Sequence, residues 1–373
     1  MYGYFRSMAI PRIRQLPGRP VWIHVISRCV RKAYLCGGRD GRWNHRRKWV
    51  EDRLRELSGV FAVEVAAYAV MSNHVHAVVR MSPSGSAAWS DREVVERWLT
   101  VFGKNADRMA VNGLRDPMIE QLAQDAAWVA ERRARLADLS WFMRAFKEPI
   151  ARRANAEDDC SGRFWEGRYT SVPLLDHAAV VACMAYVDLN PVRARIAPTP
   201  EASSFTSVQS RVRGRQRHRA VTRVRAQVAA GVFTAEQAAT TLKRAGLGEE
   251  SIAAAAVSAE AGSFVASIVR CQRAHDGQVM SSFELSLDDY LTLVDLTARI
   301  LRPDKRGAID PRLPELLERL DLKLDAWIAT MSGWRQMHGR AVGSKAVRDE
   351  MAEHHGLRWI RNRCPLFVQR AAS

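Results

Sequence analysis

The sequence predicts an α+β fold, in which a ferredoxin-like (split βαβ) antiparallel sheet with helices on one face precedes a mainly helical C-terminal region. Two observations lead to this prediction. Over the first 200 residues the spacing of apolar side chains switches between the repeats of strands and helices, in the order β-α-β-β-α-β-α. Residues 226–265 are rich in alanine, and several short helices are expected from Leu285 to the end.

The first three strands are predicted in the N-terminal quarter of the chain. Alternating apolar side chains indicate a strand over residues 19–30, and a helix follows over 46–57, closed by Gly59. Only a Ser-Asn pair separates the β-rich stretches 60–71 and 74–81. These two strands are therefore expected to form a hairpin.

Helices and a fourth strand complete the expected sheet domain. A helix over residues 91–102 precedes a helical insertion at about 104–137. Residues 138–157 carry apolar side chains at helical spacing with basic residues between them. A loop and the fourth strand follow in residues 162–175. Asp176 can then N-cap a helix that runs to about residue 189.

These elements divide the chain into three expected parts. Residues 1–200 hold the sheet, the arginine-rich segment 201–227 is expected to be a basic linker, and residues 228–373 form a helical region with possible DNA-binding capacity. Near the end, residues 339–364 are a weak candidate for a helix-turn-helix, with glycines as breaks.

Charge is the strongest global signal in the 373 residues. Lys and Arg outnumber Asp and Glu by 57 to 40, which gives a net charge of +17. Residues 1–50 hold twelve basic residues against one acid, and residues 211–225 hold seven arginines and no acid. Such localised basic blocks favour a polyanionic partner, most simply nucleic acid. The alternative is a solubilising basic tail or linker.

Other compositional features indicate a cytoplasmic protein, expected at the nucleoid if it binds DNA. No apolar run approaches the roughly 18 residues of a membrane-spanning helix, so no membrane partner is expected. The first residues do not have the pattern of a signal peptide. Six cysteines lie scattered without a CxxC pair, as is typical of reduced thiols.

The stretch MSNHVHAVVR places two histidines on one strand. Side chains at positions i and i+2 of a strand point to the same face, so His74 and His76 are expected side by side with Val75 opposite. Two neighbouring imidazoles are a partial metal site. The alternative is a pair of polar residues on a solvent-facing hairpin. The Asp and His that metallo-hydrolases add after such a pair are absent here, where the sequence continues AVVR.

A second stretch, MAYVDLNPVRARI, carries a tyrosine and an asparagine four residues apart. Tyr186 and Asn190 share one helix face if the last turn persists, although Pro191 disfavours helix at the residue before it. A tyrosine hydroxyl beside a metal-bound phosphate can act as a nucleophile. The alternative is a buried tyrosine with a capping asparagine.

The ordered set HVISR, MSNHVHAVV, RFWEGRY and YVDLNPVRA resembles the HUH single-tyrosine transposases, specifically the REP-associated tyrosine transposases and related small insertion-sequence enzymes. The resemblance covers roughly residues 15–200. It implies that His74 and His76 bind Mg²⁺ or Mn²⁺, that Asn190 is a third metal ligand, and that Tyr186 is the nucleophile. Ser72 stands where the family often has proline.

The implied activity is cleavage and strand transfer of single-stranded or hairpin DNA through a 5′-phosphotyrosine intermediate. One alternative is a regulator that binds DNA or RNA without catalysis. Another is a rolling-circle initiator or relaxase, which shares the chemistry. The sequence leaves open whether the protein is a monomer or a homodimer, and whether Tyr186 serves its own histidine pair or that of a partner.

Aromatic and basic residues near these motifs are candidate DNA contacts. Aromatic rings can stack on unpaired bases, and arginines can bind phosphates. Tyr169 is the second candidate nucleophile. The candidate DNA-binding residues are Arg28, Arg31, Lys32, Arg163, Trp165, Arg168, Arg193, Arg211, Arg213 and Arg215.

Overall fold

The computed structural model describes residues 21–38, 41–103, 115–248, 285–301, 310–337, 339 and 341–367. Three regions that entered the sequence predictions lie outside these residues. They are the first twenty residues with part of the N-terminal basic block, residues 104–114 of the expected insertion, and the end of the alanine-rich stretch.

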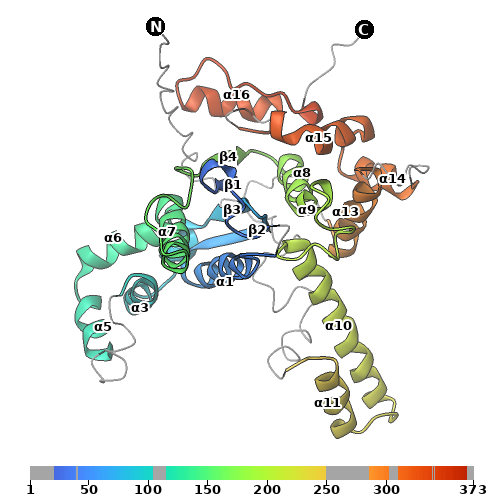
Figure 1. Cartoon of the computed structure of the whole chain (residues 1–373), viewed down its shortest axis with the longest axis horizontal. Helices are drawn as coiled ribbons and strands as arrows, with labels where there is room; N and C mark the ends of the chain where they lie inside the picture. Colours follow the sequence, from blue (N-terminus) through green and yellow to red (C-terminus); the bar gives the residue numbers. More distant parts are fainter. Residues whose placement is uncertain are drawn as a thin grey trace.

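The centre of the protein is a four-stranded antiparallel sheet, so the prediction of a mixed fold of helices and an antiparallel sheet is confirmed (Figure 1). The spatial order of the strands is β2-β3-β1-β4, with the first strand inside the sheet. The hairpin predicted around the Ser-Asn pair joins β2 to β3. The strands are β1 (Trp22–Arg28), β2 (Val63–Val70), β3 (His74–Met81) and β4 (Thr170–Leu174).

The two faces of β3 have different roles. Val75, Ala77 and Val79 pack into one hydrophobic core, whereas Val78 packs into the other. His74 and His76 share the face of Val78, because side chains alternate along a strand. The expectation that the histidines lie side by side, with Val75 opposite, is therefore confirmed.

Helices α1, α3 and α7 cover the first face of the sheet. Their apolar residues interlock with those of β2 and β3 in one continuous core. Pro149 lies inside α7 without ending it. Gly59 also lies inside α1, so this helix ends slightly later than predicted. The helices that precede β4 in the sequence are α1 (His45–Val60), α2 (Pro83–Ala87), α3 (Asp91–Phe102), α5 (Arg115–Ala123), α6 (Ala126–Leu136) and α7 (Leu139–Glu157).

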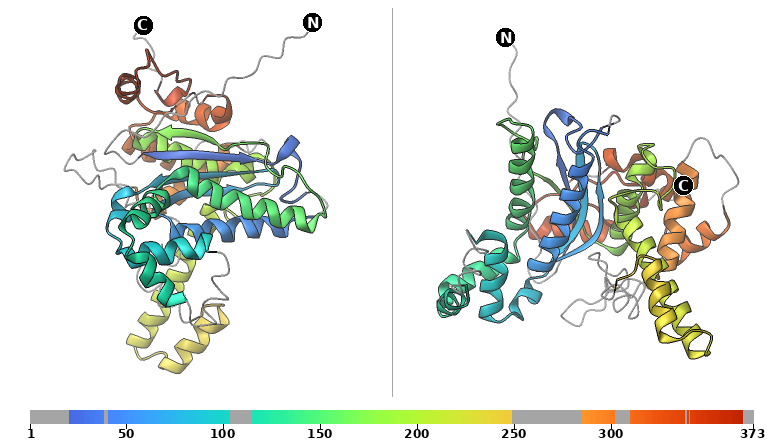
Figure 2. Two further views of the ribbon diagram at one scale, coloured as in Figure 1. Left: turned by 90° about the vertical axis from the view of Figure 1, so that its left-hand side faces the viewer. Right: turned by 60° about the horizontal axis from the view of Figure 1, so that its bottom comes forward.

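Helix α8 (His177–Asp188) covers the opposite face, so the prediction of helices on one face is wrong (Figure 2). From Ala179 to Asp188 every residue of α8 is buried. A helix that is apolar all round needs packing partners on every side. The sheet covers one side of α8, and the C-terminal helices α13 and α15 cover the other.

The end of α8 keeps its direction through the Asn-Pro pair. Leu189 has helical backbone angles of φ −87° and ψ −1°, and a short helix α9 (Asn190–Arg193) follows directly. Pro191 stands in the first turn of α9, where its missing N–H breaks no hydrogen bond. Asp176 caps the start of α8 by accepting a hydrogen bond from the Ala179 N–H, as the sequence indicated.

The arginine run, expected to be a basic linker, forms helix α10 (Ser207–Ala229). Its first turns are buried against β2 and α13, and its remainder projects from the body of the protein (Figures 1 and 2). Helix α11 (Ala235–Arg244) folds back on it through a small apolar cluster that includes Val221, Val224 and Leu242. We call α10 and α11 together the basic arm.

The C-terminal region is helical, and it packs on α8. The stretch expected to hold a helix-turn-helix contains one α-helix, α16, in its described part, so no second helix is available there for that motif. No helix in the described ranges is both long and apolar enough to cross a membrane. The helices are α13 (Leu287–Leu301), α14 (Arg312–Arg319), α15 (Leu324–Met337) and α16 (Lys345–His354).

Candidate active site

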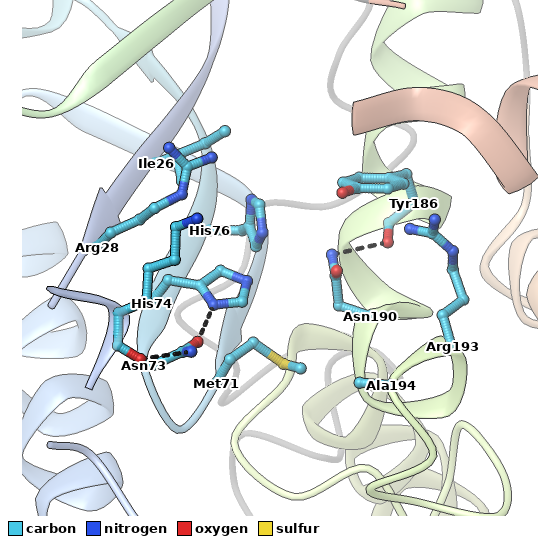
Figure 3. A pocket seen from close by; sticks show the side chains of 11 residues that line it. Ile26, Arg28, Met71, Asn73, His74, His76, Tyr186, Asn190, Arg193 and Ala194 are labelled. Atoms are coloured by element: carbon cyan, nitrogen blue, oxygen red, sulfur yellow. Dashed lines mark hydrogen bonds between the residues drawn. The ribbon is translucent and has the colours of Figure 1, made fainter. Parts of the chain in front are cut away.

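A pocket of about 280 Å³ opens between the ends of β1 and β3 on one side and α8 and α9 on the other (Figure 3). It brings together the histidine strand and the tyrosine helix, which are more than a hundred residues apart in the chain. The residues that line it are Ile26, Arg28, Lys32, Met71, Asn73, His74, His76, Tyr186, Asn190, Arg193 and Ala194.

The protonation of His74 follows from its neighbour Asn73. The Asn73 side chain donates its Nδ2 to the Lys32 carbonyl at 3.1 Å, which fixes the orientation of the amide. Its Oδ1 therefore faces Nδ1 of His74, at 2.6 Å. Because an amide oxygen only accepts, Nδ1 of His74 is the donor, and in the neutral ring Nε2 then carries the lone pair that a metal needs.

A third histidine, His24, lies against His76 on the neighbouring strand. His24 lies on β1 and is fully buried, and its Nε2 is 2.9 Å from Nδ1 of His76. The two rings stack with centroids 5.1 Å apart. In the tautomer in which Nδ1 of His76 donates to His24, Nε2 of His76 carries the lone pair that a metal needs. Metal-binding histidines usually have such a partner on the second ring nitrogen.

Tyr186 faces the histidine pair from α8. Its ring centroid lies 5.8 Å from that of His76, at an interplanar angle of 89°, and the residue is only 3% exposed. Figure 3 shows the hydroxyl end of the ring directed across the pocket toward the histidine strand. Tyrosine and histidines belong to the same chain, so the pocket needs no partner subunit to bring them together.

Asn190 lies one turn beyond Tyr186. It keeps a helical conformation although Pro191 follows it, and it lines the pocket. Its Nδ2 donates to the Tyr186 carbonyl at 3.0 Å and lies 3.4 Å from the Val187 carbonyl. These bonds use the donor side of the amide. The carbonyl Oδ1 is the part of the side chain that can serve a ligand in the pocket.

Two side chains pack against the Tyr186 ring. The guanidinium carbon of Arg193 lies 4.6 Å from the ring centroid. The indole of Trp334, from the C-terminal helix α15, stacks on the ring with centroids 5.6 Å apart and planes 26° apart. Nothing in the sequence around Trp334 indicated this contact.

The basic candidates at the pocket come from both of its sides. Arg28 and Lys32 line it on the side of the histidines, and Arg193 lines it on the side of Tyr186. Arg28 is paired directly with His74 across the sheet. Arg31 is exposed on the neighbouring turn and does not line the pocket.

Two of the predicted DNA-binding residues are buried, and a third is paired with an acid of the protein. Trp165 is 7% exposed, and its Nε1 donates to the Lys147 carbonyl, so its ring is core rather than a stacking platform. Arg211 is 2% exposed and faces Asp188. Arg215 is paired with an acid of α13 at 2.7 Å. Arg211 and Arg215 of α10 therefore pair with carboxylates of this protein. The sequence pattern did not indicate these pairs.

The remaining basic candidates are on the surface. Arg163 and Arg168 are exposed in the loop before β4, and Arg213 is exposed on α10. Tyr169 is buried on the opposite side of the sheet from the histidines, and its hydroxyl is 3.3 Å from Ser140 Oγ. The second candidate nucleophile therefore lies away from the pocket.

Asp188, two residues after Tyr186, anchors the tyrosine helix from behind. It accepts hydrogen bonds from the Ser207 hydroxyl, the Val208 N–H and the Tyr290 hydroxyl, and Arg211 lies 3.6 Å away. Burial raises the pKa of Asp188, while Arg211 and these hydrogen bonds act in the opposite direction. The network joins α8, α10 and α13 at one buried carboxylate.

The donor set suits a divalent cation held by two imidazoles and one amide oxygen. Among the described residues no group of three or more His, Cys, Asp and Glu side chains forms a metal cluster, so a fuller set of protein ligands is not seen there. A site with few protein ligands leaves positions open for the oxygens of a phosphate.

The chain matches no protein-family model and no curated protein. Part of it is similar to a tyrosine transposase of known structure. That structure shows the REP-associated tyrosine transposase bound to a REP hairpin, and the alignment covers 55% of this chain and 86% of that chain, with 12% identity and a TM-score of 0.33. A likeness this distant carries no argument about chemistry, which has to rest on the geometry of the pocket.

Proposed function

We propose that this protein is a metal-dependent DNA strand transferase that cleaves single-stranded or hairpin DNA with Tyr186 as nucleophile. The observation that supports the proposal is the meeting of Tyr186 with His74 and His76 in one pocket. A role in binding alone does not require this combination. We also interpret the sheet, with its order β2-β3-β1-β4, as the split βαβ (ferredoxin-like) arrangement.

The proposed metal is Mg²⁺ or Mn²⁺, held by Nε2 of His74 and His76 and by Oδ1 of Asn190. The hydrogen bonds at both Nδ1 atoms support this assignment, because metal-binding histidines usually have such a bond on the ring nitrogen that does not bind the metal. Imidazole favours Mn²⁺ over the harder Mg²⁺. When bound, the ion supplies charge withdrawal from the scissile phosphate.

The proposed covalent step uses the chain's own hydroxyl. Tyr186 loses its proton to solvent or a nearby base, and its oxygen attacks phosphorus. The bond between phosphorus and the 3′ oxygen breaks, and this oxygen takes up a proton to give a 3′-hydroxyl. The 5′ phosphate remains on Tyr186. A second 3′-hydroxyl can reverse the step and join two strands, so no nucleotide cofactor is consumed.

Basic residues at the pocket are proposed to hold the strand. Arg28, Lys32 and Arg193 line the pocket in which a phosphate would lie. Arginine binds phosphate oxygens in pairs, which positions the backbone without reading sequence.

The basic arm is proposed as a second DNA contact. Helix α10 carries no acidic residue, and its exposed arginines include Arg213, Arg217, Arg223 and Arg225. Its exposed arginines run from Arg213 to Arg225, which is roughly 18 Å at the rise of an α-helix, about half a turn of duplex DNA. This length suits contact with part of the stem of a hairpin. A protein with these contacts is expected in the cytoplasm, associated with the nucleoid.

The test is formation of a covalent adduct. Single-stranded hairpin oligonucleotides from the DNA that flanks the gene are incubated with the protein and Mn²⁺, and the mixture is separated under denaturing conditions. We expect an adduct that resists denaturation and is lost in Tyr186→Phe. Tyr169→Phe is the matched control and should retain the adduct. An adduct that survives Tyr186→Phe refutes the assignment of the nucleophile.

A regulator that only binds nucleic acid is the competing function. It predicts tight binding of the same hairpins with no adduct in any metal, and equal binding by the wild type and Tyr186→Phe. That pair of results would replace the enzyme by the binding protein.

A further inference from the structure

We infer that the C-terminal helical region completes the active site, with Trp334 as the residue that positions Tyr186. The inference rests on the proposed role of Tyr186 as nucleophile. It gives a function to a part of the chain that the sequence motifs leave unassigned.

The stacked rings of Tyr186 and Trp334 are both buried. Trp334 is 1% exposed and Tyr186 is 3% exposed, with their planes 26° apart. Arg193 lies over the tyrosine ring at 4.6 Å. The tilted stack with Trp334 and the cation–π contact with Arg193 are favourable geometries for an aromatic ring. Together they restrict rotation of the side chain about its two torsions.

The same elements connect Arg193 to α15. Nη2 of Arg193 lies 3.3 Å from the carbonyl oxygen of Ser332, two residues before Trp334. Arg193 therefore contacts both the tyrosine ring and the helix that supplies the tryptophan. Trp334 also approaches His24, with ring centroids 6.4 Å apart. One side chain of the C-terminal region thus contacts both the nucleophile and the residue behind the histidine pair.

Helix α15 is itself fixed to the sheet domain. Trp327, two turns before Trp334, is fully buried and donates its Nε1 to Thr297 of α13. Further along the chain, Val342 exchanges backbone hydrogen bonds with β4, accepting from Leu175 and donating to Pro173. These contacts join the C-terminal region to α13 and to the segment that leads from β4 into the tyrosine helix.

Position matters because an in-line attack needs the hydroxyl oxygen close to phosphorus and correctly aligned. A misplacement of about 1 Å can cost a factor of roughly 100 in rate. A tyrosine that projects from a helix into an open pocket has several rotamers available. The stack with Trp334 selects the one that directs the hydroxyl toward the histidines.

The experiment compares Trp334→Leu, which removes the aromatic face, with Trp334→Phe, which keeps one. Phe142→Leu is the matched control, since it removes a buried aromatic ring from the core on the other face of the sheet. The protein is labelled with 3-fluorotyrosine, and the ¹⁹F signal of Tyr186 is assigned by its loss in Tyr186→Phe. Single-turnover adduct formation and hairpin affinity are measured in the same samples.

We expect Trp334→Leu to broaden or shift the Tyr186 signal and to slow adduct formation by about 100-fold with hairpin affinity unchanged. Trp334→Phe should recover most of the rate. Phe142→Leu should lower the melting temperature but leave the Tyr186 signal in place. If Trp334→Leu and Phe142→Leu change the signal equally, or if Trp334→Leu leaves it unchanged, the positioning role is wrong.

The two proposals fail separately. Absence of any adduct in the wild type would refute the strand-transfer function, while the ¹⁹F signal would still report whether Trp334 holds the Tyr186 ring. An adduct in the wild type that forms at the same rate in Trp334→Leu would refute the positioning role alone.

Discussion

Replacing Asp188 by asparagine tests whether the buried network behind the tyrosine helix holds the fold together. The substitution keeps the size of the side chain and removes its charge. Oδ1 can still accept from Ser207 and Val208. The amide that replaces Oδ2 would face the Tyr290 hydroxyl and the guanidinium of Arg211, which then lacks its buried counter-charge.

The cost can be estimated from the burial of the pair. Asp188 is 0% exposed and Arg211 is 2% exposed, so water cannot replace the lost partner. Breaking a buried ion pair from one side costs about 3–5 kcal/mol. Tyr290→Phe removes one hydrogen bond to the carboxylate and is expected to cost less, about 1.5–3 kcal/mol. Asp188→Asn should therefore destabilise the protein more than Tyr290→Phe.

Urea denaturation followed by circular dichroism gives both free energies of unfolding. The decisive arm is the double variant Asp188→Asn with Arg211→Met, which removes both charges. Because the double variant leaves no unpaired buried charge, it should be more stable than Asp188→Asn alone. Additive losses, or a cost below 1 kcal/mol for Asp188→Asn, would show that the pair is not coupled.

Three further predictions concern the metal site, the basic arm and acid stability. His24→Leu should weaken Mn²⁺ binding by about 10- to 100-fold, measured by titration calorimetry. His24→Gln should recover part of the lost affinity. Unchanged affinity in His24→Leu would contradict the role of the hydrogen bond between His24 and Nδ1 of His76. Arg213→Gln with Arg217→Gln should lower the salt dependence of duplex binding by roughly two in slope, and an identical slope would show that the arm is only a solvated face. The hydrogen bond from Arg46 lowers the pKa of Asp158, so the stability that it contributes is present above the ordinary value of 3.8 and is lost as pH falls below it. Asp158→Asn should flatten that part of the acid unfolding curve, and a curve of unchanged shape would contradict the assignment.

The local elements of the sheet domain were predictable because each has a strong signal of its own. The alternation in β1 and β3, the Ser-Asn turn and the cap at Asp176 all depend on a few neighbouring residues. Which faces the helices cover was not predictable in the same way. It depends on what packs against α8, and those partners come from the C-terminal region.

The pocket was predictable only for those residues that have a local signal in the sequence. His74 and His76 follow from the two-residue repeat, and Tyr186 was identified through the ordered motifs. His24 has a weaker signal: it lies on the strand next to the histidine pair and alternates with Ile26, which is paired with His76. Trp334 has no local signal, because its contact with Tyr186 depends on the packing of helices 150 residues apart.

The arginines show the limit of reading charge from a sequence. Arg211 and Arg213 are two residues apart in one basic run, yet one is buried against Asp188 and the other is exposed. A helix places such neighbours on different sides, and only the tertiary structure decides which side faces the protein. The count of basic residues therefore overestimated the surface available for DNA.

Both edges of the sheet are occupied by the chain's own segments. On β2, the Val70 N–H donates to Phe205, the Tyr68 N–H donates to Ser207 Oγ, and the Ala66 carbonyl accepts from Arg211. On β4, Val342 takes the equivalent place. A second copy could pair with the covered stretches of these edges only by displacing the segments that occupy them. Copies of this protein are therefore expected to associate, where they do, by a route other than continuation of the sheet.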